Sequence, residues 1–193
     1  NGKVSGVGDG KFNPDGTVTR AEFLKMAMDS FGIVGHAYRD GECLDATNDD
    51  WYCYYLQGAL DKDIIPKEMI ENCNVTKVTK TLAEATDDKK AVTTDVNVYT
   101  GKFDGDKPIT REEMAAIAVR CKNYKMRRLT DWDNERRYPI FSFKDSDEID
   151  EKYISDVVEA YNLNYIDGME DGRFAPKENL TRAQAAVVMN NLK

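Results

Sequence analysis

The sequence predicts a mainly α-helical protein built from tandem helix-loop-helix repeats, with a small β-hairpin inserted in the second repeat. Three observations lead to this prediction: a motif that occurs three times, a helix-start signature that closes each motif, and a β-branched stretch that interrupts the pattern. The chain has 193 residues, and 41% of them are hydrophobic. This composition is too apolar for full disorder, and the length allows a core without disulfide staples.

The recurring motif is Gly, a basic residue and Phe, followed after six residues by Thr-Arg-x-Glu/Gln, with an aliphatic residue before the Thr. Its three copies occupy residues 10–22, 101–113 and 172–184. The copies align without gaps, although they are offset by 91 and then by 71 residues. Copies at unequal offsets indicate a repeat protein that carries insertions.

Each motif ends in the expected start of a helix. The three threonines are predicted N-caps, and the Glu or Gln three positions later completes a capping box. The capping pairs are Thr19 with Glu22, Thr110 with Glu113, and Thr181 with Gln184. Apolar residues then recur at helical spacing, which predicts a buried face.

Two residues of these helices have a predicted structural role. Cys121 lies on the apolar stripe of the second helix, where we expect a buried hydrophobic residue rather than a ligand. Gly32 follows the first helix and is its expected end.

A second type of helix precedes the last two motifs. Tyr38-Arg39-Asp40 resembles Phe143-Lys144-Asp145, and the run that begins at Trp51 matches the later run that begins at Lys152. Trp51 is expected to share one helix face with Tyr55 and Ala59.

The first copy lacks this front half. The sequence therefore divides, within one domain, into the second half of repeat 1 (residues 1–34), repeat 2 (35–126), and a linker with repeat 3 (127–193).

Two insertions interrupt the repeats. Within residues 66–99, two β-branched and partly alternating stretches flank Thr86-Asp87-Asp88-Lys89-Lys90, which predicts a β-hairpin. Residues 122–139 mix basic and acidic side chains, and we interpret them as a solvated linker.

Composition and charge exclude several classes of function. The formal net charge of -8 argues against nucleic acid and anionic membrane surfaces, which both require a basic footprint. No apolar run is long enough to span a membrane. The N-terminal residues contain no apolar signal segment, so we expect a cytosolic protein or a mature fragment.

The cysteines and the histidine suggest no metal centre. The four cysteines are Cys43, Cys53, Cys73 and Cys121, and no two of them have C-x-x-C spacing. The sequence is compatible with disulfide bonds and with buried free thiols. His36 is the single histidine, and it lies beside glycine in an expected loop. No nucleophile and base stand in a catalytic pattern, so we expect no enzyme, no catalytic residue, no metal and no cofactor.

Capping does not explain the arginine of each motif. Arg20, Arg111 and Arg182 occupy the first turn of their helices, where the helix dipole disfavours a cation. A guanidinium there is suited to a carboxylate or phosphate, and the unpaired N–H groups of the helix end also favour an anion. The sequence thus predicts anion sites, with internal pairing to an acid such as Asp40 or Asp145 as the alternative.

The motifs resemble those of the S-layer homology (SLH) family. Thr19-Arg20-Ala21-Glu22 matches the family's Thr-Arg-Ala-Glu signature, the second copy departs at Glu112, and the third departs at Gln184. The family's aromatic-x-Asp start, its aromatic residue near the first helix and its Gly-Asp-Gly-x-Phe loop also have counterparts, the last at residues 8–12.

The resemblance implies three repeats in a pseudo-threefold, mainly helical arrangement that anchors surface proteins to bacterial cell walls. The implied ligand is a secondary cell wall polysaccharide carrying pyruvate ketals, bound in grooves between repeats. Arg20, Arg111 and Arg182 would meet the pyruvyl carboxylate, and Asp40, Asp145 and Trp51 would line the sugar side. The location would be the extracellular cell surface, and the absent signal segment would indicate a mature fragment of an exported protein.

Two departures limit the number of sites. The missing front half of repeat 1 leaves at most two complete grooves, unless a preceding half-repeat or a partner chain supplies it. Gln184 keeps the capping geometry, but it removes a charge that would position Arg182.

Two alternative functions assign a different role to the motif residues. Residues 11–22 approach an EF-hand calcium loop through Asn13, Asp15, Gly16 and Glu22, although Lys11 is a poor first ligand. The other is a structural or protein-interaction module of a surface layer, in which the arginines pair only internally.

Overall fold

The computed structural model describes residues 12–36, 42–47, 49–83, 90–127 and 143–192. Within them, five α-helices form most of the regular structure: α1 (Arg20–Ser30), α2 (Cys53–Leu60), α3 (Arg111–Arg127), α4 (Ile154–Asn162) and α5 (Arg182–Asn191). Two antiparallel hairpins join β1 (Glu42–Cys43) to β2 (Ala46–Thr47) and β3 (Glu71–Ala83) to β4 (Val92–Lys102). Three short 3₁₀ turns are η1 (Lys67–Met69), η2 (Ser146–Glu148) and η3 (Glu151–Tyr153). The mainly helical class with an inserted hairpin is confirmed.

All three predicted capping boxes are present. The Thr19 hydroxyl accepts from the Glu22 N–H at 3.2 Å, and the Glu22 carboxylate accepts from the Thr19 N–H at 2.9 Å. The same reciprocal bonds join the other two capping pairs at the starts of α3 and α5. Gly32 follows the end of α1 with φ of 61°, a left-handed conformation that glycine adopts without strain.

The residues before the three caps meet one another through their backbones. Val18 N–H donates to Leu180 C=O, Leu180 N–H donates to Ile109 C=O, and Ile109 N–H donates to Val18 C=O, with N···O distances of 2.9–3.0 Å. The three bonds close a ring among segments that are far apart in the sequence. The starts of α1, α3 and α5 are therefore held around one centre.

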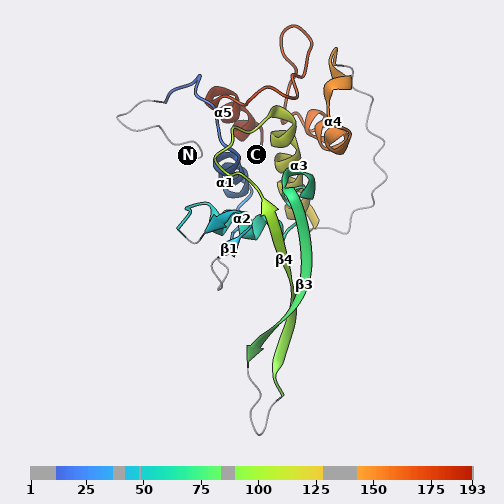
Figure 1. Ribbon diagram of the computed structural model, residues 1–193. Helices are drawn as coiled ribbons and strands as arrows, with labels where there is room; N and C mark the ends of the chain where they lie inside the picture. The colour runs from blue at the N-terminus through green and yellow to red at the C-terminus, as the bar shows by residue number, and fades with distance from the viewer. Residues whose placement is uncertain (1–11, 37–41, 48, 84–89, 128–142, 193) are drawn as a thin grey trace.

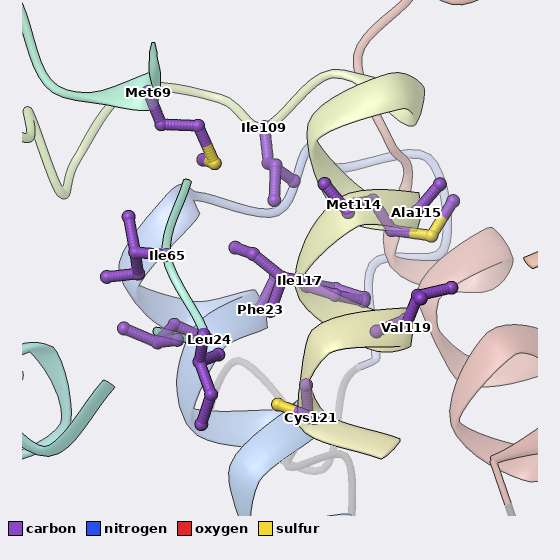
Figure 2. Packing of buried hydrophobic residues seen from close by; sticks show 14 of the residues in the cluster. Phe23, Leu24, Ile65, Met69, Ile109, Met114, Ala115, Ile117, Val119 and Cys121 are labelled. Carbon is purple, nitrogen blue, oxygen red and sulfur yellow. The ribbon is translucent and has the colours of Figure 1, made fainter. Parts of the chain in front are cut away.

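Nearly all buried hydrophobic side chains of the described residues belong to one cluster, which runs from Val18 to Leu192. Phe23 of α1 lies beside Ile117 of α3 in the close-up view of this cluster, and Leu24 and Met114 also belong to it (Figure 2). Cys121 is fully buried in this cluster, as predicted, and burial raises the pKa of its thiol. Cys53, Cys73 and Cys121 are free thiols.

The β3–β4 hairpin extends away from the helical body (Figure 1). Its strands are longer than the two stretches that predicted it, and Thr76 pairs with Val98 and Val78 with Val96 in its register. Near its base, the Tyr99 hydroxyl donates to Leu60 C=O at 3.4 Å. The hairpin thus contacts the helical body near its base, where Tyr99 and Cys73 pack against the core.

Two details of the helices differ from the sequence predictions. Helix α3 continues to Arg127, although we expected a linker from residue 122. Lys122 and Asn123 bind the Glu159 carboxylate of α4, at 3.2 Å each, and this tertiary contact supports the extra turn. The rest of the expected linker, residues 128–139, lies outside the described residues.

Trp51 precedes α2 instead of sharing its buried face. Tyr52 is the residue that turns inward, and it packs so closely on Gly105 that a Cβ there would lie 2.6 Å from its ring. The inward face of α2 continues through Leu56 and Ala59, while Trp51 stays 52% exposed.

Candidate functional site

The arginine of each motif binds the phenylalanine of another motif. Each guanidinium donates to the Phe carbonyl and lies over the same Phe ring, a geometry that combines a hydrogen bond with a cation–π contact. The pairs are Arg20 with Phe103 (2.7 Å to oxygen, 5.9 Å to the ring centroid), Arg111 with Phe174 (2.7 and 5.1 Å) and Arg182 with Phe12 (2.9 and 5.4 Å). The three predicted arginines therefore lie at contacts between motifs.

Arg20 is buried and forms an ion pair inside the protein. Its Nε donates to Glu113 Oε2 at 3.1 Å, and its Nη2 contacts Glu113 Oε1, so the two planar groups meet at two points. Internal pairing was the alternative to an anion site, with Asp40 or Asp145 as partner. The partner is instead Glu113, because the ring of backbone bonds brings the first turn of α3 beside that of α1.

Arg111 is equally buried, at 6% exposure, but has a different set of partners. Its Nε binds Phe174 C=O and its Nη2 binds Asp167 C=O at 2.9 Å. Among the described residues, no carboxylate comes within 4.0 Å of this guanidinium. Burial lowers its pKa, while Glu178, Asp145 and Asp167 act in the opposite direction from farther away.

Arg20 and Glu113 line a cleft of about 450 Å³ that we call the Arg20 cleft. Both acidic and basic side chains line it, and several of them pair with each other. Lys177 binds Glu112 at 2.7 Å and Asp150 at 2.6 Å. Glu71 and Lys102 at the base of the β3–β4 hairpin also line this cleft.

Glu112 marks the departure of the second motif from Thr-Arg-Ala-Glu, and it is 3% exposed. Its carboxylate accepts from Lys177 and from the Asp150 N–H at 3.1 Å. Burial raises its pKa, and these two donors lower it. The residue thus links the second motif to the start of the first helix of repeat 3.

Arg111 lines a second, smaller cleft of about 180 Å³ that we call the Arg111 cleft. Its wall is largely apolar, and Val187 remains 58% exposed beside it. Gln184, the capping residue of α5, lines the same cleft. Gln184 therefore shares a cleft with the arginine of the preceding motif, and the predicted effect of its missing charge on Arg182 stays a prediction.

Asp145 is 4% exposed and serves the phenylalanine loop. Its two carboxylate oxygens accept from the N–H groups of Phe174 and Ala175 at 2.7 and 2.8 Å. Asp145 therefore does not pair with a motif arginine, and its visible role is to hold the loop that Arg111 binds.

Asp45 has the same role in repeat 2, and the sequence analysis missed it. Its carboxylate accepts from Phe103 N–H at 2.7 Å and from Asp104 N–H at 2.9 Å. A signal was available, because Asp45 precedes Asp50 by five residues as Asp145 precedes Asp150. Asp40, which we had aligned with Asp145, lies outside the described residues.

The remaining predicted residues have simpler surroundings. Trp51 contacts Tyr52 edge to face at 5.6 Å between ring centroids, and it is not among the residues that line either described cleft. Glu22, the last residue of the EF-hand alternative, uses its carboxylate for the helix cap. In the described residues, no group of three or more His, Cys, Asp or Glu could hold a metal ion.

No helix in the described part of the chain combines the length and the apolar character needed to cross a membrane.

Known proteins resemble this chain along nearly its full length. A family model of the S-layer homology domain matches residues 2–24 and 142–186. The chain is 32% identical over 189 residues to an amylopullulanase of Thermoanaerobacterium thermosulfurigenes, 32% over 192 residues to exoglucanase XynX of Acetivibrio thermocellus, and 30% over 189 residues to an endoglucanase of Bacillus sp. (strain KSM-635). Each alignment covers 98% of this chain but only 8%, 14% and 16% of those proteins.

Proposed function

Because the chain belongs to the S-layer homology family, we propose that it is a non-catalytic module that anchors a protein to the bacterial cell wall. Its ligand is an acidic secondary cell wall polysaccharide that carries pyruvate ketals, bound between repeats through motif arginines. The place of action is the extracellular cell surface.

The observation that carries this proposal is that the buried guanidinium of Arg111 has backbone carbonyls as partners but no carboxylate among the described residues. A buried guanidinium is costly unless anions or hydrogen-bond acceptors surround it, and Arg111 has two backbone carbonyls but no described carboxylate within ion-pair distance. A ligand carboxylate would complete its coordination. The arginine fork suits such a two-oxygen partner.

The walls of the Arg111 cleft favour a particular kind of acid. Met114, Ile166 and Val187 provide apolar surface beside the cation. A pyruvate ketal carries a methyl group and a carboxylate on the same carbon, so it would place one on the apolar wall and the other on Arg111. The cleft volume of about 180 Å³ leaves room for these two small groups.

The proposal includes a pseudo-threefold arrangement of the three motifs. Its support is the cyclic order of backbone hydrogen bonds. The backbone N–H of Arg20 donates to Lys107 C=O, that of Arg111 to Glu178 C=O, and that of Arg182 to Gly16 C=O, at 2.8–3.0 Å. Each motif therefore donates to the next and accepts from the previous one. Repeat 1 would be completed by a preceding half-repeat or a partner chain.

Arg20 favours the second candidate function, a structural or protein-interaction module of a surface layer. Its ion pair with Glu113 needs no external partner. This function predicts that all three arginines are satisfied internally and that acidic wall polymer does not bind.

Binding to purified, pyruvylated wall polysaccharide tests the proposal, with depyruvylated polymer as the matched ligand. We expect Arg111→Gln to weaken binding by at least about tenfold, the equivalent of 1.4 kcal/mol. Arg173→Gln is the matched control, since Arg173 is an exposed arginine near Arg111 in the fold that pairs with Asp171. Equal binding to both polymers, or to both variants, would overturn the proposal.

A further inference from the structure

The capping residues of α3 and α5 each contribute to the arginine site of the preceding motif. Glu113 caps α3 and pairs with Arg20 of α1. Gln184 caps α5 and lines the cleft of Arg111 of α3. The chain thus contains two versions of one arrangement, which differ by a carboxylate in the first and an amide in the second.

We infer that this capping residue determines which cleft accepts an acidic ligand. Glu113 takes the anion position at Arg20 and excludes an external carboxylate, whereas Gln184 leaves the position at Arg111 available. This inference rests on the proposed function, and it adds that the two described clefts are not equivalent.

The exclusion at Arg20 follows from burial and connectivity. Glu113 has an exposed side-chain fraction of 8%, and it binds the Nε–Nη2 edge of the Arg20 guanidinium. Nη1 of the same guanidinium donates to the carbonyls of Phe103 and Met69. A ligand carboxylate would have to displace it and leave a buried charge without a partner. Glu113 also competes as part of the same molecule, which gives it a high effective concentration.

The wider Arg20 cleft reinforces this exclusion. Six acidic side chains and five basic ones line it. Lys102 pairs with Asp104 at 3.2 Å, and Lys177 pairs with two acids. The cations of this cleft are therefore largely neutralised by its own carboxylates.

The Arg111 cleft contains far fewer charges, with one basic and one acidic residue in its lining. The Oε1 atom of Gln184 accepts from the Thr181 N–H at 3.0 Å, so the helix cap uses the acceptor end of the amide. The other end of a glutamine amide is a donor, which suits a carboxylate. Asp167 is the one acidic residue among those that line this cleft, and it offers its backbone carbonyl to Arg111.

The test uses a methyl hexopyranoside that carries a pyruvate ketal, with its methyl ester as the neutral control of similar shape. Side-chain Nε–Hε NMR signals report Arg20 and Arg111 separately in one titration. The signals are assigned with Arg20→Lys and Arg111→Lys. The two matched variants are Glu113→Gln, which gives the Arg20 cleft an amide, and Gln184→Glu, which gives the Arg111 cleft a carboxylate.

In the unmodified chain, we expect the acid to shift the Arg111 signal and to leave the Arg20 signal in place. Glu113→Gln should make the Arg20 signal respond, and Gln184→Glu should weaken the Arg111 response at least about tenfold. The ester should shift neither signal. Thermal unfolding checks that each variant is folded, and Gln184→Glu decides the question alone should Glu113→Gln not fold.

Two results would overturn the inference, and they differ from failure of the proposed function. A response of Arg20 in the unmodified chain, or an unchanged Arg111 affinity in Gln184→Glu, shows that the capping residue does not select the cleft. A complete absence of response in every form, with no binding to the wall polymer, removes the proposed ligand class and the inference together.

Discussion

The guanidinium of Arg20 in α1 and the carboxylate of Glu113 in α3 form a buried two-point ion pair between residues 93 positions apart. Their side chains are 7% and 8% exposed. The pair joins the first turns of two helices whose starts the backbone ring already holds together. The pair therefore links α1 to α3, and it also neutralises the charge of Arg20 in the Arg20 cleft.

Loss of one member of this pair should destabilise the fold strongly. Arg20→Met leaves Glu113 buried without its partner, and we expect the free energy of unfolding to fall by about 3–5 kcal/mol. The double variant Arg20→Met/Glu113→Gln removes both charges and should recover part of the loss. Urea denaturation gives the free energy of unfolding of the unmodified chain, the single variant and the double variant. Lys25→Met is the control, because the exposed Lys25–Asp29 pair should contribute less than about 1 kcal/mol.

The role of Asp145 can be separated from ligand binding. Asp145→Ala leaves the N–H groups of Phe174 and Ala175 without their acceptor. We expect a loss of at least about 3 kcal/mol in unfolding free energy, since each of the two bonds to the charged acceptor contributes about 1.5–3 kcal/mol. Asp145→Asn keeps one acceptor oxygen and should lose less. A variant that loses polymer binding but keeps its stability would make Asp145 a ligand residue instead.

Asp156 should give the stability a specific pH dependence. Burial raises its pKa above the ordinary 3.8, and Arg120, at 3.2 Å, reduces the rise. The folded state therefore holds this proton more tightly than the unfolded chain, so the contribution of Asp156 to stability falls as the pH rises from 3.8 through its raised folded pKa.

The measurement for Asp156 is urea denaturation from pH 3.5 to 7, on the unmodified chain and on Asp156→Asn. The variant cannot ionise, so its stability relative to the unmodified chain should improve as the pH rises through this window. A difference that stays constant with pH would contradict the raised pKa.

The outer part of the β3–β4 hairpin should be dispensable for folding. Thr76 and Val98 are directly paired, so replacement of residues 77–97 by Asn-Gly closes a shorter hairpin. Tyr99 and Cys73, which pack against the core, are retained. We expect thermal unfolding to stay cooperative, with a change of less than about 1 kcal/mol in unfolding free energy, because an isolated two-stranded ribbon is itself marginally stable. Loss of cooperative unfolding would show that the outer strands support the core.

Trp51 tests the predicted sugar contact. Its side chain is half exposed, so Trp51→Ala should change the unfolding free energy by less than about 0.5 kcal/mol. If the indole packs on the polymer, binding should weaken by about fivefold, the equivalent of ~1 kcal/mol. Tyr54→Ala removes another exposed aromatic residue of the same region and serves as the control. Equal binding by both variants would remove Trp51 from the ligand site.

Features that depend on neighbours within a few residues could be predicted from the sequence. The capping boxes at Thr19, Thr110 and Thr181 each close over three residues, so spacing alone specifies them. The β3–β4 hairpin was predicted from local alternation, whereas its register comes from the structure. Asp45 was missed because the alignment to Asp40 compared residue types without keeping the distance to the helix.

The repeated motif, the helix starts and the arginine in each first turn can all be read along the chain. What each arginine contacts depends on how the motifs pack against one another. Arg20 meets Glu113, and Arg111 shares its cleft with Gln184. The reason is that the backbone ring places the start of α1 beside the second motif and the start of α3 beside the third. Local hydrogen bonds are fixed by spacing along the chain, whereas ion pairs and burial depend on segments that packing brings together from far apart.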